Sequence, residues 1–145
     1  MSFSPEGWIE VARMPDTANE HAWVGVVDLG AIADVADEDS ERLFGLSKDC
    51  VSGGKSADVL AAGRGLPANP SAQVRRAIEQ IAAHEAKFGD GEFGGYSYAL
   101  WAEIREYSLT VPTEKSQWTL PFALARILER QFGADRVRFV VWFNW

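Results

Sequence analysis

The sequence predicts a single α+β domain, residues 1–145, in which a small, mostly antiparallel sheet has three to four helices packed on it. Strand-like segments lie near both ends of the chain, and helix-like segments lie between them. The 145 residues are the length of one domain, and 47% of them are hydrophobic, which is ordinary for a folded protein.

Two strands near the N-terminus are expected to pair as a hairpin. Residues 7–13 alternate between two sets of side chains, and the valine-rich residues 22–32 follow after a turn-rich connection. Beyond them, the acidic residues 37–39 precede Leu43 and Phe44. Negative charge at a helix start interacts favourably with the helix dipole, so this segment predicts a short helix.

The middle of the chain predicts a long loop followed by a long helix. Residues 47–69 are rich in serine, glycine and charge and have few apolar anchors, which is typical of a binding loop. Asn69 is a favourable N-cap and Pro70 suits a first helical position, so a helix is expected from there to about Lys87. The glycines of residues 89–95 then predict a second loop.

Three further elements complete the expected fold. Ser97 is suited to cap a helix that reaches Tyr107, because apolar residues follow it at helical spacing. Residues 119–132 predict an amphipathic helix that ends before Gly133. Residues 136–145 predict a strand with apolar side chains on both faces, so helices should cover at least one side of it.

The charge and the cysteine content limit the classes of function. With 21 acidic and 14 basic residues the net charge is -7, which disfavours nucleic-acid polymers as partners but leaves a basic protein partner open. The single Cys50 excludes an intrachain disulfide and fits a reducing compartment. No secretory signal and no apolar run of membrane-spanning length is found, so a cytoplasmic protein without membrane contact is expected. A homo-oligomer stays open.

The motifs that would indicate an enzyme or a cofactor fail in their surroundings. Gly89, Gly91 and Gly94 match the spacing of a dinucleotide-binding loop, but a helix is expected before them, and the acids between them would repel a phosphate. Residues 54–56 match the end of a P-loop that lacks its first glycine. The two histidines lack the spacing of zinc ligands. The sequence therefore predicts no cofactor and no metal site, and it favours a protein that is not an enzyme.

Candidate ligand-binding residues lie in and beside the two predicted loops. Three cations precede or begin the long helix, and the free N–H groups at a helix start attract anions. Aromatic side chains border the second loop, where they could stack on a ring. For Arg64 two interpretations stay open: it binds a ligand, or it pairs with a carboxylate of its own chain, the second being slightly favoured. The candidate residues are Lys55, Arg64, Ser71, Arg75, Tyr96, Tyr98 and Trp101.

Five short segments, GWIEV, RLFGL, RGLPANPS, SYALW and VRFVVWFNW, resemble a family of small uncharacterised proteins from bacteria, plasmids and phages. The chain departs from the family's pattern in two places. The stretch GEFGGYSY before Trp101 has no histidine where the family has an acid-histidine-serine stretch, and the chain ends in Asn144 and Trp145 where the family ends in W-F-D. The resemblance implies a phage or mobile-element setting and no established activity. The matched residues are Trp8, Glu10, Arg64, Gly65, Leu66, Pro67, Ser71, Trp101, Trp142 and Phe143.

Two main hypotheses about function follow, and a hydrolase is a third and less favoured one. The first is a protein that binds a small anionic, nucleotide-like ligand, and that would remove a signalling nucleotide in a conflict with host defences. The alternative is a protein-binding inhibitor or immunity protein that acts through its acidic surface. Most of the six tryptophans are assigned to core packing under both hypotheses, because an indole buries much area at low entropy cost.

Overall fold

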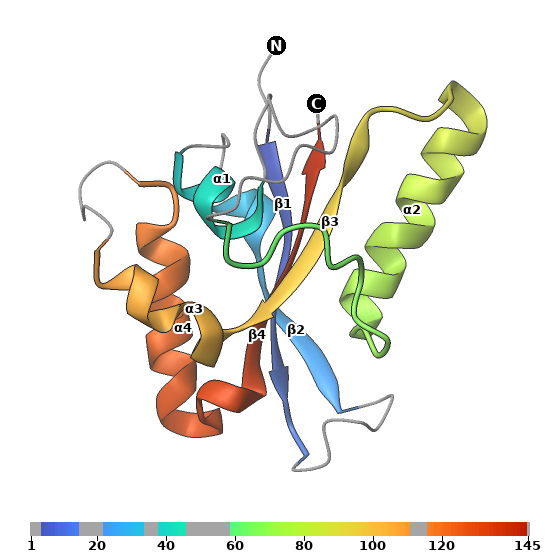
Figure 1. Ribbon diagram of the computed structural model, residues 1–145. Coiled ribbons are helices and arrows are strands. Elements are labelled where there is room, and N and C mark those ends of the chain that lie inside the picture. Colours follow the sequence, from blue (N-terminus) through green and yellow to red (C-terminus); the bar gives the residue numbers. More distant parts are fainter. Residues whose placement is uncertain (1–3, 15–21, 34–37, 46–58, 111–115, 145) are drawn as a thin grey trace.

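The computed structural model of the protein describes residues 4–14, 22–33, 38–45, 59–110 and 116–144 (Figure 1). The four strands form one antiparallel sheet in the order β2-β1-β4-β3, so the predicted α+β fold is confirmed. In chain order the elements are β1 (Ser4–Ala12), β2 (Trp23–Asp28), the 3-10 turn η1 (Leu29–Ala31), α1 (Glu38–Phe44), α2 (Ala72–Phe88), β3 (Phe93–Leu100), α3 (Trp101–Ser108), α4 (Thr119–Phe132), the 3-10 turn η2 (Ala134–Arg136) and β4 (Val137–Asn144).

The sheet is covered on both faces. Figure 1 shows α2 on one face and α1, α3 and α4 on the other. All but the last residue of β4 are buried, because this central strand packs against helices on either side. On the face of α3 and α4, Trp101 and Trp118 stack on Phe139 at ring-centroid distances of 6.0 and 5.9 Å. On the other face, Trp142 of β4 packs in one cluster with Ile81 of α2.

Gly7 allows β1 and β4 to lie against each other at the point where the sheet begins. Its φ of +138° lies in the region that favours glycine, and a Cβ built on it would lie 1.9 Å from the carbonyl oxygen of Val140. No other residue type fits at this position without displacement of the backbone of β4. The close approach of β4 therefore explains why the GWIEV segment begins with a glycine.

The predicted N-terminal hairpin, the short helix, the helix of residues 119–132 and the C-terminal strand are all confirmed. The helix predicted from Ser97 is wrong in its first half. Residues 93–100 form the edge strand β3, in which Ser97 and Ala99 are buried, and only Trp101 begins the helix. The reason is long-range, because Ser97 pairs with Val141 of β4, and no local pattern in the sequence shows that partner.

The start of α2 also differs from its prediction, by two residues. Ser71, and not Asn69, is the N-cap, and its Oγ accepts a hydrogen bond from the N–H of Val74 at 3.2 Å. Asn69 instead accepts hydrogen bonds from Arg138 on β4 through its side-chain and backbone oxygens. The side-chain oxygen that would cap the helix therefore makes a long-range contact with the sheet. None of the helices within the described ranges has the length and apolar character needed to cross a bilayer.

Candidate functional site

Arg64, on which the sequence left two interpretations open, has a carboxylate partner in its own chain. Its Nη1 donates hydrogen bonds to the two carboxylate oxygens of Glu103 at 3.1 and 3.0 Å and to the carbonyl oxygen of Tyr98 at 3.2 Å. Partial burial raises the pKa of Glu103, but hydrogen bonds from Arg64 and from the N–H of Leu100 outweigh it, so the pKa lies below its usual value. Arg64 thus ties the loop before α2 to the start of α3.

The start of α2, predicted as an anion site, already holds an anion of the protein. The N–H of Ser71 donates to Oε2 of Glu10 at 2.7 Å, and Glu10 on β1 is completely buried. The other oxygen of this carboxylate accepts a hydrogen bond from Nε of Arg138 at 2.5 Å. Burial lowers the pKa of Arg138, and the charge and hydrogen bond of Glu10 oppose that shift. The side chain of Glu10 therefore occupies the position that the sequence assigned to a ligand.

Arg138 extends this buried network to three segments of the chain. Nη1 and Nη2 donate to Oδ1 and to the carbonyl oxygen of Asn69, at 3.1 and 2.8 Å. On the other side, the guanidinium lies 3.9 Å from the ring centroid of Trp23, a close cation–π contact. The segments GWIEV, RGLPANPS and VRFVVWFNW, which carry the family resemblance, thus meet in one place, where they join α2 to the sheet.

The other predicted ligand residues do not converge. Tyr96 and Tyr98 face α2, whereas Trp101 lies in the core on the opposite face of the sheet and is 1% exposed. Arg75 is exposed on the first turn of α2, and Lys55 lies outside the described residues. The loop before α2 reaches β3 beside the second predicted loop, since the N–H of Gly65 donates to the carbonyl oxygen of Tyr96 at 3.0 Å.

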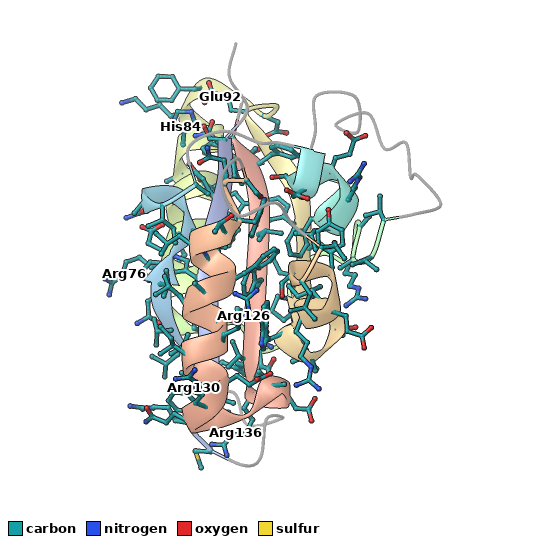
Figure 2. The ribbon with its side chains drawn as sticks, turned by 90° about the vertical axis from the view of Figure 1, so that its left-hand side faces the viewer. Arg76, His84, Glu92, Arg126, Arg130 and Arg136 are labelled. Atoms are coloured by element: carbon teal, nitrogen blue, oxygen red, sulfur yellow. The ribbon has the colours of Figure 1, made fainter. Side chains whose placement is uncertain are left out.

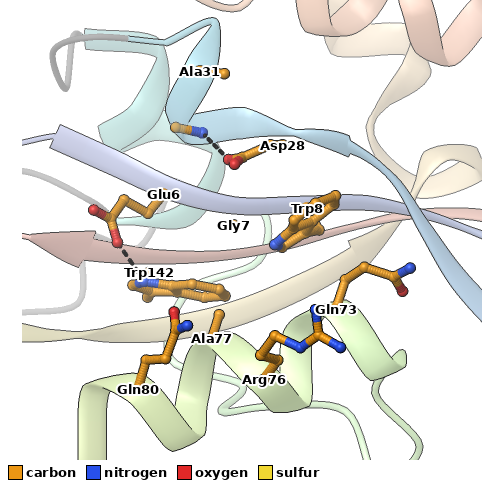
Figure 3. Close-up of a pocket in the computed structure, with 11 residues that line it drawn as sticks. Glu6, Gly7, Trp8, Asp28, Ala31, Gln73, Arg76, Ala77, Gln80 and Trp142 are labelled. Carbon is orange, nitrogen blue, oxygen red and sulfur yellow. Dashed lines mark hydrogen bonds between the residues drawn. The ribbon is translucent and has the colours of Figure 1, made fainter.

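A cleft of about 510 Å³ lies elsewhere, between α2 and the strands β1, β2 and β4 (Figure 3). The strand register explains its inner wall. Trp8 on β1 lies opposite Asp28 on β2, and Glu6 lies opposite Trp142 on β4. Since side chains two apart on a strand share a face, all four point to the side of α2. The facing wall is formed by α2, whose side chains Gln73, Arg76, Ala77 and Gln80 extend toward the strands in Figure 3.

The polar groups of this cleft are positioned but incompletely paired. Glu6 accepts hydrogen bonds from Nε1 of Trp142 at 3.0 Å and from Nδ2 of Asn144 at 3.1 Å, and Asp28 accepts one from the N–H of Gly30 at 3.0 Å. All of these donors are neutral. In the part of the chain that the structure describes, neither carboxylate has a cationic partner, and Arg76 has neither an ion pair nor a hydrogen bond. Both signs of charge are therefore available to a ligand.

The cleft continues along α2 toward the C-terminal end of the helix. A second compartment of about 290 Å³ shares Glu6 and Trp142 with the first and adds His84 and Phe93. His84 is held there by Glu92, whose Oε2 lies 2.8 Å from its Nε2 (Figure 2). The result is a groove with a polar, charged end and a more aromatic end.

The sequence does not predict this cleft, although two features of its pattern agree with it. Core packing is the prediction for most of the tryptophans, and Trp142 is buried, yet Trp8 is only half-buried. Gln73, Arg76 and Gln80 follow one another at spacings of three and four residues, so they share a face of α2 beside its apolar stripe. A polar helix face beside a buried apolar stripe usually indicates a face that is exposed to solvent. Here the sheet lies opposite this face of α2, so the face becomes the wall of a cleft.

No protein-family model, no curated protein and no solved structure matches the chain, so the family resemblance stays a prediction. Among the described residues, no three histidine, cysteine, aspartate or glutamate side chains form a group that could hold a metal ion.

Proposed function

We propose that the protein binds a small, ring-bearing ligand with an anionic group, such as a nucleotide, in the cleft between α2 and the sheet. The observation that carries this proposal is the position of Arg76. It extends from α2 into a cleft that also presents the half-buried indole of Trp8, and it has no partner within the described residues. A cation without a partner, next to an aromatic face, favours a ligand that combines a planar ring with negative charge.

The chemistry of the cleft supports each part of such a ligand. The indole of Trp8 offers a surface on which a base can stack, an interaction that is tolerant of base identity. The guanidinium of Arg76 can bind phosphate oxygens in a bidentate manner. Gln80 adds an amide that can donate or accept. The volume of about 510 Å³ falls in the range of small-molecule sites.

The alternative, a protein-binding inhibitor acting through its acidic surface, is supported less by the geometry. A protein partner is bound by a broad surface, whereas Glu6, Asp28 and Arg76 converge in a concave site of small-molecule size. In the phage or mobile-element setting that the resemblance implies, binding of a nucleotide would withdraw a signal from a host defence.

Isothermal titration calorimetry with nucleoside monophosphates, cyclic nucleotides and ADP-ribose tests the proposal. Arg76→Gln should weaken binding roughly 10- to 150-fold, the effect of losing a hydrogen bond to a charged group. Arg75→Gln is the matched control, because Arg75 is the neighbouring exposed arginine of α2 and does not line the cleft. It should leave the affinity unchanged. Absence of heat with every compound, or an equal loss in both variants, would refute the proposal.

A further inference from the structure

We infer that the cleft selects a guanine-type ring, which is a base with two adjacent N–H donors, and that the carboxylate of Asp28 accepts hydrogen bonds from both donors. This inference rests on the proposed function, since it names the class of ligand for the same cleft. The inner wall of the cleft carries two carboxylates, those of Glu6 and Asp28, which have no cationic partner among the described residues. Arg76 alone does not explain why a site for an anionic ligand has these acids.

The position of Asp28 is suited to hydrogen bonding with the edge of a base that stacks on Trp8. It lies directly opposite Trp8 across β1 and β2, so its carboxylate is beside the indole on the same face of the sheet. A ring stacked on Trp8 lies parallel to the indole, and the residue opposite Trp8 on the neighbouring strand is Asp28. Asp28 is exposed, and it is one of the residues that line the cleft.

Among the described residues Asp28 accepts one hydrogen bond, which leaves Oδ2 and the second lone pair of Oδ1 available to accept others. Oδ1 accepts the N–H of Gly30 and caps the 3-10 turn η1, which holds the carboxylate in one orientation. For Oδ2 the described part of the chain provides no donor. Glu6, two positions before Trp8 on the same strand face, adds a second carboxylate to the wall, and its orientation is held by Trp142 and Asn144.

An ionised carboxylate is an acceptor only, and this decides between the bases. Guanine presents a ring N–H and an exocyclic amine side by side, which match the two oxygens of a carboxylate. Adenine and cytosine place a single amine beside an acceptor nitrogen, and hypoxanthine has no amine. The acceptor nitrogen of adenine or cytosine would face a carboxylate that has no proton to donate, so both groups would lose a hydrogen bond on binding. Such an unpaired polar group weakens binding by more than the loss of one hydrogen bond.

The substitution Asp28→Asn tests the inferred contact between Asp28 and guanine without removing the N-cap of η1. The carbonyl oxygen of asparagine can still accept the N–H of Gly30, since asparagine caps as well as aspartate. The second oxygen, however, becomes an N–H donor. Xanthine has a carbonyl where guanine has its amine, so this variant should prefer xanthine to guanine.

Calorimetry with the monophosphates of guanosine, inosine and xanthosine measures the selection. The native protein should bind guanosine monophosphate roughly 5- to 150-fold more tightly than inosine monophosphate, the range for one bidentate base contact. Asp28→Asn should abolish that preference and bind xanthosine monophosphate more tightly than the native protein does. Glu79→Gln, an exposed carboxylate of α2 outside the cleft, is the matched control and should retain the native order.

The outcomes separate the inference from the proposed function. Equal binding of guanosine and inosine monophosphates, or an unchanged preference in Asp28→Asn, overturns the inference and leaves a nucleotide-binding cleft. A tighter complex with adenosine monophosphate overturns it in the same way. If none of the nucleotides binds, the inference and the proposed function fall together.

Discussion

Removal of the Arg138 side chain should destabilise the protein more than any surface substitution, because it leaves a carboxylate unpaired in the core. In Arg138→Met, Glu10 loses its only ion-pair partner among the described residues, and it is completely buried between β1 and α2. Asn69 loses two hydrogen bonds, and Trp23 loses the guanidinium 3.9 Å from its ring. The methionine retains most of the volume, so packing is changed least.

The magnitude follows from this environment. Removing one partner of a buried ion pair costs about 3–5 kcal/mol, most of it from the charge that remains. The whole free energy of unfolding of such a domain is about 5–15 kcal/mol. For a chain of this length, the melting temperature should therefore fall by roughly 6–20 °C. The range of about 3–5 kcal/mol includes the loss of the cation–π contact with Trp23, because the same Arg138 side chain makes that contact and the ion pair with Glu10.

Urea unfolding followed by circular dichroism measures the effect, with Arg130→Met as the control. Arg130 is an exposed residue of α4 without an ion pair or hydrogen bond among the described residues, so the control should stay within about 0.5 kcal/mol of the native protein (Figure 2). The double variant Glu10→Gln with Arg138→Met removes both charges, and its glutamine can still accept the N–H of Ser71.

The double variant should lose less stability than the sum of the two single variants, by about 1–3 kcal/mol. This follows because each single substitution leaves the opposite charge buried, whereas the double substitution leaves none. Strict additivity, or a cost below about 1 kcal/mol for Arg138→Met, would show that Glu10 and Arg138 do not depend on each other and would refute the reasoning.

Two further predictions concern the loop before α2 and the sheet. The pKa of Glu103 is lowered in the folded protein, so its contribution to stability is present above its unfolded value of 4.5 and is lost as pH falls through the folded value. Arg64→Gln should reduce this pH dependence of unfolding, and an unchanged dependence would contradict it. Gly7→Ala should cost more than about 2 kcal/mol through strain and the clash with Val140. Gly89 also has a positive φ, of +90°, but no neighbouring atom within 4 Å of an added Cβ, so Gly89→Ala should cost only about 1–2 kcal/mol. Equal costs in thermal unfolding would argue against the close approach of β1 and β4.

The candidate site shows where prediction from the sequence reached its limit. Arg64 and Ser71 were correctly seen as residues at the approach to a helix, but whether they meet a ligand or a carboxylate of the same chain depends on distant residues. Glu103 lies 39 residues from Arg64, and Glu10 lies 61 residues from Ser71. Arg76 had no signal of its own, because an exposed arginine on a helix is ordinary until a second wall faces it.

The sequence by itself determined the elements that depend on local periodicity. The amphipathic helix of residues 119–132 and the two-faced apolar strand that follows it are written in the spacing of their side chains, which is a local property. Only the tertiary structure decided that β3 is a strand, that Glu10 meets Arg138 across 128 residues, and that Trp8 and Asp28 form one wall of a cleft. These features depend on strand register and on the face each helix covers, which are set by pairing between distant segments.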